Sequence, residues 1–238
     1  MKLFSYWRSS CSWRVRIALA YKNVPHTLVP VHLVQGGGEQ HGAEHVARNP
    51  SAQVPVLEID ANGVTQHLGQ SLPILEYLEE CHPHPALLPA DPSLRARARQ
   101  MAELVNSGIQ PLQNLSVLQR LKNVHSVDEG PWAAYWIARG LTAMEQLASA
   151  QAQDLASGGA RRGQLVASGP SRGQFLIGNA PTLADVCLVP QLYNARRYQV
   201  DLAPYPTLVR VEAACHRVDA FVSSHPDRQP DAVPAPAR

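Results

Sequence analysis

The stretch Ser9-Ser10-Cys11-Ser12 places three hydroxyls and one thiol where an apolar strand gives way to a predicted helix. The first amides of a helix are unpaired and carry partial positive charge, so such a turn favours an anion. A serine hydroxyl donates a hydrogen bond there but takes up no proton near neutral pH. The residues leave two interpretations open: a serine is only the helix cap, or Cys11 is a nucleophile.

Two later segments carry further candidates. Pro55 falls inside an apolar strand predicted from Val54, although proline belongs at strand starts, edges and bulges. A cis Val54–Pro55 bond would turn the Val54 backbone outward, toward an extended peptide-like ligand. Gln70 and Ser71 begin another predicted helix and offer an amide, a hydroxyl and a backbone N–H to a carboxylate. A plain helix cap is the alternative for this pair.

Four polar residues beyond position 100 have two interpretations each. Arg196 and Arg197 end a predicted helix, where cations complement the helix dipole, but arginine also binds carboxylates through a planar fork. Gln110 and Asn114 lie one helical turn apart and face either a cleft or solvent.

The first ninety residues alternate in predicted type, which is typical of an α/β domain with a mixed sheet. The pair Asn62-Gly63 predicts a hairpin turn, since both residues tolerate positive φ. The predicted strands are 2–7, 27–33, 54–59 and 64–66, and the predicted helices are 10–22, 42–47 and 71–80.

The remainder is predicted to be helical. Residues 1–81 form the first domain, a proline-rich linker spans 82–92, an all-helical domain spans 93–224, and residues 225–238 form a disordered tail. A Gly/Ser-rich flexible excursion is expected over 150–173. Thr182 and Asp185 fit a capping box. The predicted helices are 101–118, bent at Gly108 and Pro111, then 132–147, 183–196 and 207–218.

Composition points to a globular protein that binds small molecules. The chain has 238 residues, 45% of them hydrophobic and 17% charged, and a net charge of +2, which gives no case for nucleic-acid or membrane binding. A strand directly after Met1 leaves no room for a signal peptide, so we expect a cytoplasmic protein. The cysteines lack CxxC spacing, and His41 and His45 lack a third ligand, so neither disulfides nor a metal is predicted.

Long, ordered motifs from both halves resemble those of the zeta-class glutathione transferases. The resemblance covers essentially the whole chain and implies a thioredoxin-like α/β N-terminal domain, an all-α C-terminal domain, glutathione as the cofactor, and a homodimer. The motifs are SSCSWRVRIAL, QVP, QSLPILEYLEE, IQPLQNLSVL and PTLADVCLVPQLYNARRYQVDLAPYPTL.

The resemblance also implies roles for individual residues. Ser9 matches the serine that hydrogen-bonds the glutathione sulfur, with Ser10 and Cys11 lining the same site. Val54, before the expected cis-proline Pro55, matches the residue whose backbone pairs with the cysteinyl part of glutathione. The remaining implied contacts are Gln53, Gln70, Ser71, Gln110 and Asn114 for glutathione, and Arg8 and Arg197 for a diacid substrate.

The activity implied by the resemblance is glutathione-dependent cis–trans isomerisation of maleylacetoacetate to fumarylacetoacetate, a step of aromatic amino-acid degradation. A thiolate adds to the double bond, the bond rotates, and elimination restores it. Three alternatives stay open at this point: isomerisation of maleylpyruvate, glutathione transfer to or dehalogenation of small α-halo acids, and a non-catalytic scaffold with a transferase-like fold.

Overall fold

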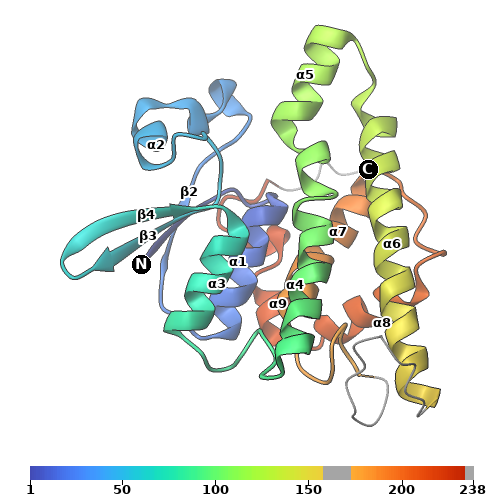
Figure 1. The fold of residues 1–238 in the computed structure, drawn as a ribbon. Coiled ribbons are helices and arrows are strands. Elements are labelled where there is room, and N and C mark those ends of the chain that lie inside the picture. Colours follow the sequence, from blue (N-terminus) through green and yellow to red (C-terminus); the bar gives the residue numbers. More distant parts are fainter. Residues whose placement is uncertain (158–172, 234–238) are drawn as a thin grey trace. The chain divides into compact units, whose positions relative to one another are not determined.

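The computed structural model describes residues 1–157 and 173–233. The chain forms two compact units (Figure 1), one made of Met1–Ala86 and Val218–Arg238, the other of Leu87–Arg217. The chain thus leaves the first unit within the segment that we predicted as a linker, and it returns to that unit at Val218.

A four-stranded mixed sheet organises the first unit, in the order β2-β1-β3-β4. β1 and β2 are parallel, so they need a crossover, which helix α1 supplies. β3 is antiparallel to both β1 and β4. The turn predicted at Asn62-Gly63 joins β3 to β4, with φ of 57° and 80° at its two residues. The strands are β1 (Lys2–Ser5), β2 (Thr27–Pro30), β3 (Val56–Ala61) and β4 (Val64–Gly69).

Helix α1 is buried along most of its length, because α3 and α9 both contact it. Its apolar residues Val15, Ile17 and Leu19 are fully buried. Arg14 and Arg16 are buried in the same helix, so their guanidinium groups need hydrogen-bond partners inside the protein. The helices of this unit are α1 (Ser10–Tyr21), α2 (Ala43–Arg48), α3 (Ser71–Cys81) and α9 (Asp219–Ser223), with 3₁₀ turns at Gln35–Gly37, Glu39–His41 and Pro226–Arg228.

Helix α7 is the buried element of the second unit, with every side chain from Leu183 to Leu192 buried. Helices α4, α6 and α8 contact it. The helices of this unit are α4 (Pro92–Asn106), α5 (Leu115–His125), α6 (Glu129–Ser157), α7 (Leu183–Arg197) and α8 (Pro206–Cys215), with a 3₁₀ turn at Gln110–Gln113.

The first turn of α7 contains the predicted capping box, which is confirmed. One carboxylate oxygen of Asp185 accepts hydrogen bonds from the N–H and the hydroxyl of Thr182, both at 2.8 Å, and the other accepts from the N–H of Leu176 at 2.9 Å. Complete burial raises the pKa of Asp185 to about 6, although the hydrogen bonds act in the opposite direction.

The single helix predicted over 101–118 is wrong. Helix α4 ends at Asn106, a 3₁₀ turn occupies Gln110–Gln113, and α5 starts after Asn114. Pro111 is the second residue of that turn, and the Asn114 side chain caps α5. Proline cannot continue a helical hydrogen-bond ladder and asparagine favours caps, so the chain stops and restarts where we expected only a bend.

Two predictions of irregular structure are also wrong in part. Helix α6 continues to Ser157, into the predicted excursion, and the rest of that excursion over 158–172 lies outside the described residues. The predicted disordered tail instead forms a 3₁₀ turn at Pro226–Arg228, because this segment follows α9, which packs on α1. Residues 234–238 lie outside the described part.

Within the described residues, no helix has both the length and the apolar character of a membrane span.

Candidate active site

The register of the sheet brings three of the predicted segments together. Phe4 in β1 lies opposite Val56 at the start of β3, and Val56 lies opposite Gly69 at the end of β4. The residues that follow β1, precede β3 and follow β4 therefore meet at one end of the sheet. These are the segments around Ser9, Val54 and Gln70, which are far apart in sequence.

Ser9 is the N-cap of α1. Its Oγ accepts a hydrogen bond from the N–H of Ser12 at 3.2 Å, and its own N–H donates to the Tyr6 carbonyl at 3.0 Å. As an acceptor in the cap, the hydroxyl keeps its hydrogen for an external anion. Ser9 and Cys11 are half-buried, Ser10 is buried, and the first turn carries no acidic residue. Both interpretations of Ser9, cap and anion donor, are compatible with this geometry.

Gln53 and Val54 precede the cis peptide bond that we predicted at Val54–Pro55. The Gln53 carbonyl accepts hydrogen bonds from His45 Nε2 at 3.0 Å and from Asn49 Nδ2 at 2.9 Å. Helix α2 and its C-cap thus fix the backbone on the N-terminal side of Val54. Sequence analysis missed His45 and Asn49 in this role, because nothing in their spacing indicates a contact with residue 53.

Gln70 and Ser71 start helix α3. Gln70 has a positive φ of 67°, and its Nε2 lies 3.3 Å from Oε1 of Gln53. Ser71 is buried, and its Oγ accepts from Nη1 of the buried Arg14 at 3.0 Å. The N-terminal turns of α1 and α3 are therefore joined by Arg14, whose contact with Ser71 sequence analysis did not predict.

The loop after β2 adds another polar side chain to the same end of the sheet. The N–H of Val31 donates to the Ser5 carbonyl at 2.8 Å, which joins the end of β2 to the end of β1. In the loop that follows, Gln40 is buried and donates through Nε2 to the Leu33 carbonyl at 3.2 Å. Its Oε1 is buried without a partner among the described residues, which makes it a candidate acceptor for a ligand.

The other candidates have the following surroundings. The Arg8 guanidinium carbon lies 5.2 Å from the centre of the Trp7 ring, and Arg8 is half-buried. In the second unit, Arg197 is exposed at the end of α7, with Nη1 3.2 Å from Oδ1 of Asn194. Gln110 opens a 3₁₀ turn and Asn114 caps α5.

Arg196 and His45 both have hydrogen-bond partners within the protein. Arg196 forms a two-pronged ion pair with Glu212, at 2.6 and 2.5 Å, which gives it a structural role. His45 hydrogen-bonds the backbone, and the described residues contain no cluster of three or more His, Cys, Asp or Glu that could hold a metal ion.

Comparison with known proteins identifies the family. Residues 8–81 match the family described as glutathione S-transferase, N-terminal domain. The chain is 47% identical to the maleylacetoacetate isomerase of Rattus norvegicus over 99% of this chain and 96% of that protein. A bacterial zeta-class maleyl pyruvate isomerase is 40% identical, with a TM-score of 0.84, and the match covers 98% of this chain and all of that one. The chain belongs to the zeta class of the glutathione transferase family.

A solved zeta-class relative also shows what such a site can hold. The maleylacetoacetate isomerase of Anaeromyxobacter dehalogenans 2CP-1 is 49% identical, with a TM-score of 0.80, over 98% of this chain and 97% of that one. Its structure has glutathione bound in the active site. The family resemblance drawn from the sequence is confirmed, as is the predicted fold of a thioredoxin-like domain with a helical domain.

Proposed function

We propose that this transferase-family chain is a glutathione-dependent enzyme that isomerises maleylacetoacetate to fumarylacetoacetate. The observation that carries the proposal is that the segments around Ser9, Val54 and the pair Gln70-Ser71 meet at one end of the sheet. The similarity to maleylacetoacetate isomerases over nearly the whole chain supports it.

The site fits the chemistry of glutathione, a peptide with one thiol and two carboxylates. Helices α1 and α3 both begin here, and neither has an acid in its first turn, so their N-terminal amides favour anions. We assign the γ-glutamyl carboxylate to Gln70 and Ser71, with Gln53 holding Gln70 in place. The Val54 backbone is assigned to the cysteinyl part. The family resemblance also implies glutathione contacts from Gln110 and Asn114.

Ser9 is the residue we assign to the glutathione sulfur, with Ser10 and Cys11 lining the turn. When bound, glutathione supplies a thiolate that adds reversibly to the cis double bond, which becomes single, rotates and is restored as trans on elimination. Lowering a thiol pKa from about 8.5 by two units needs about 2.7 kcal/mol of preference for the anion. One charge-assisted hydrogen bond from Ser9, about 1.5–3 kcal/mol, together with the α1 dipole, supplies that amount.

The diacid substrate needs cationic partners. We assign its carboxylates to Arg8 and Arg197, whose planar guanidinium groups suit two-pronged recognition. Negative charge that develops on the substrate carbonyl is stabilised by the amides at the start of α1. We also propose that the protein acts in aromatic amino-acid catabolism as a cytoplasmic homodimer, which the family resemblance implies.

A second candidate substrate is maleylpyruvate, a shorter diacid with the same cis double bond. Similarity to a maleyl pyruvate isomerase over the whole of that chain favours it. Comparing kcat/KM for maleylacetone, a stable analogue of maleylacetoacetate, with that for maleylpyruvate distinguishes the two functions.

The first experiment is isomerisation of maleylacetone by the purified protein, with and without glutathione, for wild type and Ser9→Ala. We expect turnover that requires glutathione and a fall in kcat/KM of about 10- to 100-fold in the variant, which is the value of one hydrogen bond to an anion. Ser149→Ala, in α6, is the control and should retain wild-type turnover. Undiminished turnover by Ser9→Ala would transfer the role to Ser10 or Cys11, and no turnover of either diacid would refute the proposed function.

A further inference from the structure

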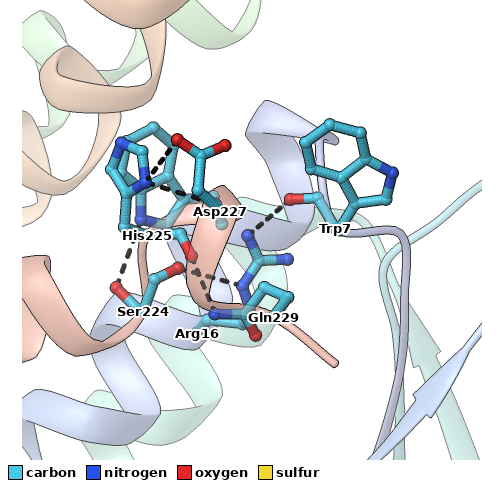
Figure 2. A network of polar contacts seen from close by, with 7 residues as sticks. Trp7, Arg16, Ser224, His225, Asp227 and Gln229 are labelled. Atoms are coloured by element: carbon cyan, nitrogen blue, oxygen red, sulfur yellow. Dashed lines mark hydrogen bonds and ion pairs between the residues drawn. The ribbon is translucent and has the colours of Figure 1, made fainter. Parts of the chain in front are cut away.

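The loop between β1 and α1 is held from two sides. Arg16 donates from Nη1 to the carbonyl of Tyr6 at 3.3 Å and from Nη2 to that of Trp7 at 2.8 Å; the second contact is drawn in Figure 2. From the C-terminal segment, Oδ2 of Asp231 accepts from the N–H of Trp7 at 2.9 Å. The Tyr6 carbonyl also accepts from the N–H of Ser9. Both peptide groups of Trp7 are therefore fixed two residues before Ser9.

The C-terminal segment is itself anchored on α1. Nε of Arg16 donates to the Ser224 carbonyl at 3.3 Å, a contact that Figure 2 draws between the two residues. The indole N–H of Trp13 donates to the Ser224 hydroxyl at 3.2 Å, and the Trp13 ring stands edge-on to His225 with ring centres 5.0 Å apart. The segment that carries Asp231 is thus packed against the helix that Ser9 caps.

Arg16 and Asp231, which hold Trp7 from two sides, carry opposite charges. Arg16 is only 3% exposed, and burial lowers its pKa to about 10, while the negative charge of Asp231 acts to raise it. A buried cation is costly unless an anion or several acceptors compensate it. Asp231 supplies the anion, and the carbonyls of Tyr6, Trp7 and Ser224 supply acceptors.

We propose that Arg16 and Asp231 form a clasp on Trp7 that positions Ser9 against the glutathione sulfur, so that the C-terminal segment sets the reactivity of the thiol. The inference rests on the proposed function. Asp231 acts through the Trp7 backbone and is a positioning residue. The strength of a hydrogen bond to a thiolate depends on the distance between donor and sulfur. Displacement of a catalytic group by about 1 Å can lower the rate by as much as ~100-fold.

The test compares Asp231→Ala and the milder Asp231→Asn with wild type. The pKa of the bound glutathione thiol is measured by ultraviolet titration of the thiolate, and kcat and KM for glutathione are measured across pH. For Asp231→Ala we expect a raised thiol pKa, a fall in kcat of about 10-fold near neutral pH, and recovery at higher pH, where the thiolate forms again. KM should stay within about twofold, because the groups that bind the rest of glutathione are untouched.

Two comparisons sharpen this test. Asp231→Asn keeps an acceptor for the Trp7 N–H but loses the charge, so its thiol pKa should lie between those of wild type and Asp231→Ala. Asp227→Asn removes the same charge from the same segment, where the carboxylate is 70% exposed and lies 3.6 Å from Nδ1 of His225. This control should match wild type in thiol pKa and kcat.

Amide hydrogen exchange at Trp7 and Ser9 reports on the clasp without any substrate. Faster exchange in Asp231→Ala supports the proposal, and unchanged exchange refutes it. A variant that loses thermal stability but keeps the wild-type thiol pKa also refutes it, since Asp231 would then be only structural. If wild type neither binds glutathione nor isomerises a diacid, the proposed function fails, and the exchange rates still decide whether the clasp holds the loop.

Discussion

Helices α1 and α7 both follow a residue with a hydroxyl group, yet their first turns have opposite surroundings. At α7 the carboxylate of Asp185 closes the turn and is completely buried. At α1 the cap is one 3.2 Å hydrogen bond to Ser9, the turn has no acid, and Cys11 is half-buried. A turn closed by its own anion serves the fold, whereas a turn without one can accept an anion from outside.

The same contrast extends to neighbouring helices. In the first unit, α3 follows Gln70, whose side chain does not cap it, and has no acid in its first turn. In the second unit, α4 is capped by the carboxylate of Asp91. The two helices that start at the sheet end thus lack anions of their own, which suits a ligand that brings a thiolate and carboxylates.

The largest expected change in stability is at the first turn of α7, which the carboxylate of Asp185 closes. Asp185→Ala should lower the free energy of unfolding by about 3–5 kcal/mol, because it leaves buried donors of Thr182 and Leu176 without an acceptor. Urea unfolding measures this. Ser9→Ala is the matched change at the first turn of α1. It should lower the free energy of unfolding by only about 1 kcal/mol, the value of an N-cap. Equal losses in the two variants would contradict the contrast.

The pH dependence of stability should reveal the buried carboxylate. The pKa of Asp185 is about 6 in the folded protein against 3.8 as the ordinary value, so the folded state binds more protons between these two values. The contribution of Asp185 to stability is therefore fully present below about pH 4 and is lost as pH rises through 6, by up to about 3 kcal/mol. Measuring the free energy of unfolding of wild type and Asp185→Asn across this pH range isolates the effect. A difference between the two proteins that does not change with pH would contradict the prediction.

The smallest expected change in stability comes from adding an anion to the first turn of α1. Cys11→Asp places a carboxylate in the first turn of α1, which should stabilise the fold by about 0.5 kcal/mol through the helix dipole. The same charge should weaken glutathione binding by about tenfold, because it repels the incoming anions. Calorimetric titration with glutathione measures this, with Cys11→Asn as the uncharged variant of equal size. Equal weakening by both variants would show that size, not charge, is responsible.

Local features were predictable from sequence because their causes lie within a few residues. The Asn62-Gly63 turn and the Thr182–Asp185 capping box follow from side-chain and backbone preferences at adjacent positions, and both are confirmed. The break between α4 and α5 was foreseen only as a bend, since apolar periodicity continues across it. The periodicity reports which face is buried, while Pro111 and Asn114 decide where the helix stops.

The sequence by itself therefore determined the residue types at each helix start and the family motifs that contain Ser9, Val54 and Gln70. The tertiary structure alone decided what holds them: His45 and Asn49 on the Gln53 carbonyl, and Asp231 on the Trp7 amide. Asp231 is 224 positions from Trp7, and a hydrogen bond over that separation leaves no periodicity or spacing in the sequence. It exists because α9 packs on α1 and carries the end of the chain back to the start of the site.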